Sequence, residues 1–275
     1  MSIRRLLTTA TISLLTASGC ASWFAPKAKL RGHPLEAQLF AGGGGTSFDH
    51  SAWAEVLSAA AHPDRGRMDY AAVSEDLLAA YLDQLAKVDL STLPRSEQKA
   101  LLINAYNAFT IRLIVQQPAL PNSIRDLPDP WGSASWTLGG ERVSLDDIEH
   151  ALLRPVFRDP RLHFALNCAS IGCPPLRSEP FVGDRLDTQL DTVTRDTLAR
   201  SQWLSVEGDR LTVTPLLDWY GPDFTAEGWA PVASTKAEWL AMFGSPAVIE
   251  AVASGAGIRY SSYDWRLNDV HTPTN

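Results

Sequence analysis

The chain is organised around fifteen residues, Arg161-Leu-His-Phe-Ala-Leu-Asn-Cys-Ala-Ser-Ile-Gly-Cys-Pro-Pro175. In the first half, apolar side chains alternate with others, and this period of two predicts a buried strand. The second half predicts a tight turn, because a glycine and two successive prolines end a strand and remove backbone donors. Cys168 therefore lies where we expect a strand to pass into a rigid loop. Catalytic side chains at such positions are both fixed and reachable.

The overall composition indicates one compact globular domain. The chain has 275 residues, of which 45% are hydrophobic and 20% charged, and this suffices for one sizeable core. The formal net charge of −7 argues against nucleic acid as a partner. The sequence contains no glycine-rich phosphate loop, no paired metal-binding cysteine motif and no nucleophile elbow. We therefore expect no cofactor and no resident metal.

The first twenty residues indicate an export signal rather than part of the fold. Two arginines precede a short apolar run, Leu6 to Ala17, which is too brief to span a bilayer. The sequence Leu15-Thr-Ala-Ser-Gly-Cys20 resembles the processing site of bacterial lipoproteins, in which the cysteine is acylated. We expect residues 1–19 to be a signal peptide and Cys20 to carry a lipid anchor in the outer membrane, facing the periplasm. The alternative is an ordinary secretion signal and a soluble periplasmic protein.

Residues 20–47 predict a flexible tether between the anchor and the folded part. They contain Pro26, Lys27, Lys29 and Pro34 and end close to Gly42-Gly-Gly-Gly45. The single folded domain is expected to cover residues 48–275.

Apolar periodicity predicts an α+β fold in which a helical N-terminal half packs on a small mixed or antiparallel sheet. A capping box at Ser144 is expected to open one helix, and Pro155 is expected to end it. The predicted helices are 51–61, 74–88, a long central helix that ends before Pro118, 146–154, 187–199, 236–243 and 247–253; the predicted hairpins are 131–142 and 203–214, and a last strand covers 258–260.

Two amides on the central helix are unusual. Asn104 and Asn107 lie three residues apart on a helix that is apolar almost throughout. Each would cost about 1–3 kcal/mol if it were buried without a partner. They are therefore expected to bond to loop carbonyls or to line a cavity.

Cys168 is the candidate nucleophile, and two histidines are candidates for its base. His163 is separated from Cys168 by an odd interval, which places the two on opposite faces of a regular strand, so His150 is slightly favoured. Asn104 would orient the histidine or stabilise an oxyanion. This chemistry is similar to that of papain or transglutaminase folds, acting on peptides or other molecules of the cell envelope. The further candidate binding residues are Asn107, Glu149, Ser170 and Tyr220.

Three other interpretations of the same residues stay open. Cys168 and Cys173 could form a structural disulfide, with the histidines and amides serving the fold of a non-catalytic binding module. The same pair could exchange disulfides with other thiols, although its spacing is not Cys-x-x-Cys. A zinc site could use both cysteines with His150 and His163, although the spacing matches no familiar zinc motif.

Several motifs, in order along the chain, resemble the domain of unknown function 547. The resemblance covers about residues 50–270 and implies a family, not an activity. The motifs are Ile103-Asn-Ala-Tyr-Asn-Ala-Phe-Thr-Ile111, Leu145-Asp-Asp-Ile-Glu-His150 with Arg154, His163-Phe-Ala-Leu-Asn-Cys-Ala-Ser170, Cys173-Pro-Pro-Leu176, Trp219-Tyr220 with Asp223-Phe224, and Tyr263-Asp-Trp-Arg-Leu-Asn268.

Overall fold

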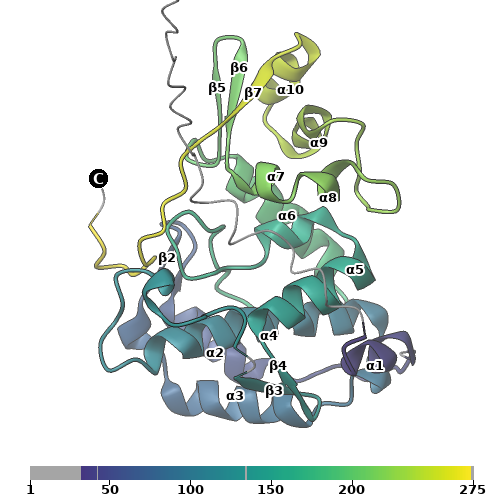
Figure 1. The fold of residues 1–275 in the computed structure, drawn as a ribbon, viewed down its shortest axis with the longest axis vertical. Coiled ribbons are helices and arrows are strands. Elements are labelled where there is room, and N and C mark those ends of the chain that lie inside the picture. Colours follow the sequence, from purple (N-terminus) through teal and green to yellow (C-terminus); the bar gives the residue numbers. More distant parts are fainter. Residues whose placement is uncertain (1–31, 42, 134, 274–275) are drawn as a thin grey trace, which may run out of the picture.

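The computed structural model describes residues 32–41, 43–133 and 135–273, and it has the expected α+β fold. The expected signal peptide and the acylated Cys20 lie outside the described residues. Figure 1 shows the first helices in the lower part of the molecule and the three-stranded sheet in the upper part, with α9 and α10 beside the sheet. The α-helices are α1 (Leu35–Ala41), α2 (Ser51–Ala60), α3 (Glu75–Lys87), α4 (Arg95–Val115), α5 (Arg154–Phe157), α6 (Leu186–Leu198), α7 (Leu216–Trp219), α8 (Gly221–Thr225), α9 (Lys236–Phe243) and α10 (Pro246–Ala253).

The strands form three small sheets. Strands β1 (Ala61–His62) and β2 (Arg67–Met68) pair antiparallel, as do β3 (Trp136–Leu138) and β4 (Glu141–Val143). The third sheet is mixed, because β5 (Leu204–Glu207) runs antiparallel to β6 (Arg210–Val213), whereas β7 (Gly257–Tyr260) runs parallel to it. The mixed sheet packs against α10, and the β3–β4 hairpin packs against α3.

The helices expected from apolar periodicity around α2, α3, α4 and α6 are confirmed. Ser74 caps α3, since its hydroxyl accepts a hydrogen bond from the Leu77 N–H at 3.4 Å. Helix α4 is buried on nearly all sides over most of its length. Its position makes it the support on which the site is built.

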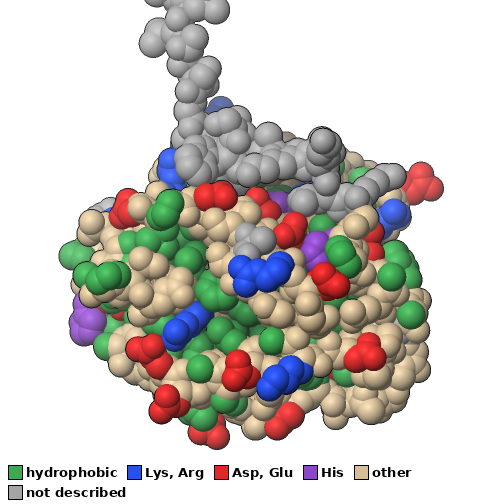
Figure 2. Space-filling view, turned by 60° about the horizontal axis from the view of Figure 1, so that its bottom comes forward, with side chains coloured by type: hydrophobic (Ala, Val, Ile, Leu, Met, Phe, Trp, Pro, Cys, Tyr) green, Lys and Arg blue, Asp and Glu red, His purple; other side chains and the backbone are tan. Residues whose placement is uncertain are grey.

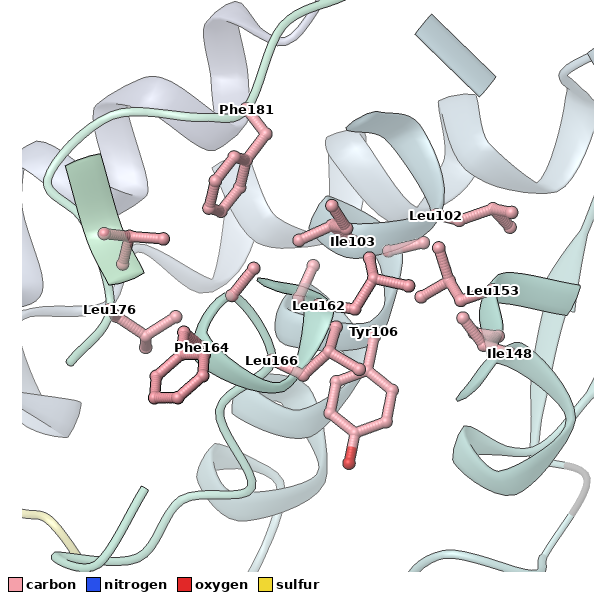
Figure 3. Packing of buried hydrophobic residues seen from close by; sticks show 14 of the residues in the cluster. Leu102, Ile103, Tyr106, Ile148, Leu153, Leu162, Phe164, Leu166, Leu176 and Phe181 are labelled. Carbon is pink, nitrogen blue, oxygen red and sulfur yellow. The ribbon is translucent and has the colours of Figure 1, made fainter. Parts of the chain in front are cut away.

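The core joins α4 to the segments that follow it in sequence. Figure 3 shows Leu102 and Ile103 of α4 among side chains that come from residues 148–153 and 162–166. The Tyr106 ring lies at the edge of this cluster, and its hydroxyl points away from the apolar side chains. The core therefore presents one polar atom of α4 at its boundary.

The expected strand around Leu162 is wrong. Residues Pro160–Phe164 form a short 3₁₀ helix instead. Asp159 caps it by accepting a hydrogen bond from the Arg161 N–H at 3.0 Å, and Pro160 occupies its first turn. Leu162, His163 and Phe164 are all buried, with exposed fractions of 0%, 4% and 0%. Since side chains at successive positions are all buried, the alternation does not separate a buried face from a solvated one, and it gave no real evidence for a strand.

Pro155 does not end the helix that begins after Ser144. The capping box is present, since the Asp147 N–H donates to the Ser144 hydroxyl at 3.0 Å and the Ser144 N–H donates to the Asp147 carboxylate at 2.8 Å. Residues Asp147–Leu153 then form a π-helix that continues into α5. The Arg154 N–H bonds to the Glu149 carbonyl, five residues back, and Pro155 falls in the first turn of α5, where its missing N–H is tolerated.

The tether expected for residues 20–47 is wrong for its second half. Residues Leu35–Ala41 form helix α1, in which Leu35 and Leu39 are 0% and 1% exposed and belong to the main core. The folded part therefore begins before residue 48. The helix is short and is flanked by glycines and prolines, so its apolar pattern is weak in the sequence.

On the face shown in Figure 2, acidic and basic side chains are interspersed, and apolar side chains are exposed between them. Among the described residues, no helix is both long and apolar enough to span a membrane.

Candidate functional site

A cavity of about 420 Å³ opens between the π-helix, the loop after Pro160–Phe164, and the segments around α7 and residue 263. Its lining combines apolar faces with a few charged and polar groups, which is the usual character of a small-molecule site. The aromatic lining residues are Tyr106, Trp131, Trp219, Tyr220, Tyr263 and Trp265, and the titratable or sulfur-bearing ones besides the tyrosines are Asp129, Asp146, Glu149, His150, His163, Cys168 and Cys173.

The π-helix places Glu149 at a buried point of the cavity wall. Its carboxylate lies near the hydroxyls of Tyr106 and Tyr220. Burial acts to raise the pKa of Glu149, but His150, His163, Arg154 and the Tyr220 hydroxyl bring that pKa below its ordinary value. Glu149 is therefore a carboxylate that favours its ionised form, with two tyrosine hydroxyls beside it.

His150, the next residue, is held in one tautomer. The Arg154 guanidinium lies 3.0 Å from Nδ1 of His150, and a guanidinium can only donate. Nδ1 must therefore accept, and the proton of the neutral ring lies on Nε2, which is 3.8 Å from the Asp146 carboxylate. The side chain is 16% exposed. His150 thus offers an N–H donor on the side of Asp146.

His163 belongs to a second, more deeply buried arrangement. Its Nε2–H donates to Asp223 at 2.8 Å, and its ring stacks on Tyr220 with centroids 3.9 Å apart. Arg154 grips the same carboxylate with two hydrogen bonds of 2.7 and 2.9 Å. Burial lowers the pKa of His163, and the bond to Asp223 opposes this only in part. The ring is neutral at pH 7, and Nδ1 is the nitrogen left for a molecule in the cavity.

Asp223 is the charged member of this arrangement. Burial acts to raise its pKa, but the hydrogen bonds from His163 and Arg154 more than offset that effect and lower the pKa below its ordinary value. An ionised aspartate that fixes one histidine nitrogen is the device by which many enzymes orient a general base.

Cys168 and Cys173 form a disulfide, with their Cα atoms 6.3 Å apart. The free thiol required by a Cys168 nucleophile is therefore not present in this structure, because oxidation has used that sulfur. A zinc site on these cysteines is excluded for the same reason in this state, and the described residues contain no group of three or more His, Cys, Asp or Glu side chains placed to hold a metal ion. The cavity nevertheless stays open beside the disulfide.

Asn104 and Asn107 hold loops rather than line the cavity. Asn104 exchanges two hydrogen bonds with the backbone of Phe181, at 2.7 and 3.0 Å. Asn107 donates to the Ala165 carbonyl and accepts from the Asn167 N–H, both at 2.9 Å. The expected role of Asn104 beside a catalytic histidine has no counterpart in this geometry.

The structure thus brings Glu149, His150, His163, Cys168 and Tyr220 to one cavity. Ser170 lies behind it, fully buried, with its hydroxyl 2.9 Å from that of Tyr263.

Sequence reasoning missed several site residues. Arg154 and Asp223, which contact the lining residues His150 and His163, stand in the quoted motifs, as do Tyr106, Asp146, Tyr263 and Trp265, although none was assigned a role. The missed lining residues are Tyr106, Asp129, Asp146, Tyr263 and Trp265.

Comparison with known proteins relates part of the chain to a protein family. A search of curated proteins and a search of solved structures find no match for this chain. Residues 90–198 match the model of a protein family. The matched region contains α4, the π-helix, His163 and both cysteines of the disulfide, whereas Tyr220, Asp223 and Tyr263 follow it in the chain. The family is described as "Protein of unknown function, DUF547", and the match over this region supports membership of that family.

Proposed function

We propose that the cavity is the active site of a hydrolase or acyl transferase in which Cys168, once its disulfide is reduced, is the nucleophile. The observation that carries the proposal is the Arg154–Asp223–His163 arrangement, whose histidine lines the same cavity as Cys168. A thiol gains nucleophilicity when an oriented base removes its proton, and a buried carboxylate that holds the base is the usual third member.

His163 is the base in this proposal. Its Nε2 is fixed by Asp223, so Nδ1 accepts the proton of the Cys168 thiol while the sulfur attacks a carbonyl carbon. The protonated ring then returns that proton to the leaving group. His150 has Nδ1 engaged by Arg154, and its Nε2–H is better suited to donate to the oxyanion, the role the sequence suggested for an amide.

The lining of the cavity supports a peptide or another amide-bearing molecule of the cell envelope as the substrate. Tryptophan and tyrosine faces suit apolar groups and, through their π-electrons, also suit cations. Asp129, Asp146 and Glu149 add negative charge on the same lining. A substrate with a free amino group near its scissile bond fits this combination.

The experiment compares the reduced and the oxidised protein on fluorogenic amide and thioester substrates. The reduced protein should turn over at least one of them, and alkylation of Cys168 with iodoacetamide should abolish that turnover. His163→Gln should lower kcat by about 10²-fold or more, whereas His271→Gln, a change at an exposed histidine, should leave kcat unchanged. Equal activity of oxidised and reduced protein would overturn the assignment of Cys168.

A second candidate is a non-catalytic binding module in which the disulfide pins the loop. The disulfide itself favours it, together with the buried amides that hold loop backbone. In that case reduction should lower the melting temperature, and no variant of His163 should change the rate at which Cys168 is alkylated.

The proposed location is the periplasmic face of the outer membrane, with Cys20 acylated, and a soluble periplasmic form is the alternative. The sequence Leu15-Thr-Ala-Ser-Gly-Cys20 supports it. Labelling with a palmitate analogue tests it, since Cys20→Ser should lose both the label and the sedimentation with membranes.

A further inference from the structure

We propose that the Cys168–Cys173 disulfide is itself reactive toward thiols, with Cys168 as the sulfur that is attacked and Cys173 as the sulfur that leaves. The partner class is a dithiol, either a small molecule or a protein with two neighbouring cysteines. The exchange stands on the disulfide loop alone. Its consequence, a site that reduction switches on, rests on the proposed function.

Access distinguishes the two sulfurs. Both cysteines line the cavity, but Cys168 is partly exposed, whereas Cys173 is only 2% exposed. A thiolate that enters the cavity therefore meets Cys168 first. Thiol–disulfide exchange depends on which sulfur is accessible and on how well the other one leaves.

Cys173 is surrounded by donors that would hold it as a thiolate. The Cys168 N–H lies 3.0 Å from its sulfur, and the Tyr263 hydroxyl lies 3.0 Å from it, closer than the 3.5 Å from the same hydroxyl to the Cys168 sulfur. Ser170 donates its own hydroxyl proton to Tyr263 at 2.9 Å, so the proton of Tyr263 is free to point at Cys173. Hydrogen bonds to a thiolate lower its pKa, and a thiol of lower pKa leaves faster.

Tyr263 is suited to this role because it keeps its proton. Burial raises its pKa above the ordinary value, so the hydroxyl remains a donor at physiological pH. Gly172 allows the ring to come this close, since a Cβ at that position would lie 2.8 Å from the Tyr263 ring.

The loop is held by bonds other than the disulfide. The Asn167 side chain donates to the Pro174 carbonyl at 2.7 Å and accepts from the Ala169 N–H at 2.9 Å. The indole of Trp203 donates to the Gly172 carbonyl at 3.2 Å. Cys173 therefore keeps its donors when the sulfur–sulfur bond is broken, and the loop is ready to close again.

The chemistry balances with a dithiol as reductant. The first thiolate of the dithiol attacks the Cys168 sulfur. The Cys168–Cys173 bond breaks, and the electron pair of that bond leaves with Cys173, which becomes a thiolate. The second thiolate of the reductant attacks the first sulfur of the reductant, which closes its own disulfide and releases Cys168. The protein gains two electrons, the dithiol loses two, and Cys168 is left as a thiol in the cavity.

Glutathione is the probe that identifies the attacked sulfur. The purified oxidised full-length protein is incubated with reduced glutathione, quenched with acid and mapped by mass spectrometry. The expected adduct lies on Cys168. An adduct on Cys173 overturns the proposal, as does a disulfide that stays intact until the protein is denatured.

Dithiothreitol measures the contribution of the donors. Tyr263→Phe should slow reduction of the disulfide about threefold for each unit by which the pKa of Cys173 rises. Tyr260→Phe is the matched control, because the Tyr260 hydroxyl bonds to Lys236, 2.9 Å away, rather than to the disulfide, and its reduction rate should equal that of the wild type. Ser170→Ala gives a second, milder variant, with near-UV circular dichroism to show that each variant is folded. Equal rates in all four proteins overturn the role of Tyr263.

Failure of the proposed function is separable from failure of this inference. If the disulfide is reduced through Cys168 but the reduced protein turns over no substrate, the thiol exchange is supported and the proposed hydrolase activity is contradicted. Turnover by a protein whose disulfide is still intact contradicts the switch.

Discussion

For single residues, the most informative feature is the pairing of a neutral histidine with an ionised aspartate in the core. His163 and Asp223 are 60 residues apart in the sequence, and no spacing rule joins them. Each has its pKa lowered, His163 mainly by burial and Asp223 by its hydrogen bonds against burial. The free energy of unfolding therefore depends on the two groups in different pH ranges, so the effect of His163 can be measured alone.

The stability of the protein should fall as the pH drops from 7.5 to 5. His163 resists a proton in the folded state but accepts one near pH 6.5 when unfolded, so acid favours the unfolded chain by up to about 1.4 kcal/mol per pH unit. The Asp223 contribution is present above the unfolded pKa and is lost only as pH falls below about 4. Urea unfolding of the wild type and His163→Gln should show a flatter pH dependence in the variant. His271→Gln should keep the wild-type slope, and an identical slope in all three proteins would contradict the assignment.

Gly172→Ala should destabilise the protein by about 1–3 kcal/mol, because the added methyl group would overlap the Tyr263 ring. Gly257→Ala is the control, since nothing lies within 4 Å of its Cβ position. The free energy of unfolding in urea gives the comparison. A Gly172→Ala protein as stable as the control would mean that the ring moves aside without cost.

For the elements, apolar periodicity succeeded for helices with one buried face and for the long, mostly buried α4, and it failed for a five-residue segment that is buried on every side. Helices α2, α3 and α6 carry stripes at helical spacing, and their predictions are confirmed. Residues 160–164 are buried all round, so their alternation carried no information about conformation. Pro155 misled because a π-helix shifts the register of hydrogen bonds, which cannot be read from residue types.

The amide of Asn107 links two elements, and its removal should cost about 2–3 kcal/mol. Asn107→Ala would leave the Ala165 carbonyl and the Asn167 N–H without partners in a buried place. Gln117→Ala, near the end of α4, removes a half-buried amide bonded to one helix carbonyl and should cost about 0.5 kcal/mol or less. Calorimetric melting temperatures rank the two variants. An equal drop in melting temperature for both would contradict the role of Asn107 in joining the two elements.

For the whole molecule, four of the predicted site residues that line the cavity, Glu149, His150, His163 and Cys168, lie in two short motifs around residues 149 and 168. Tyr263 and Asp223 stand in later motifs, but only the folded chain shows that residues so far apart in the sequence contact the same site. Nor could the sequence decide between a free thiol and a disulfide, because both are compatible with a four-residue interval. The tether prediction failed at α1 for a related reason: a short helix surrounded by glycine and proline has little periodic signal.

Helix α1 should therefore contribute to global stability. Leu39→Ala should lower the free energy of unfolding by about 2–5 kcal/mol, because Leu39 is 1% exposed. Phe40→Ala is its neighbouring control, since Phe40 is 69% exposed, and it should cost about 0.5 kcal/mol or less. Guanidinium unfolding followed by fluorescence tests this. Similar free energies of unfolding for the two variants would support a flexible tether at these residues instead.

The cavity takes its walls from two separate parts of the chain, residues 106–174 and 216–265, and this has a consequence for the order in which the site forms. A ribosome releases His163, Cys168 and Cys173 roughly fifty to a hundred residues before Tyr220, Asp223 and Tyr263, which amounts to several seconds of synthesis. During that interval the two cysteines have no tyrosine beside them, and the histidine has no aspartate. The contact of His163 with Asp223 and that of Cys173 with Tyr263 therefore form only when the last segment docks.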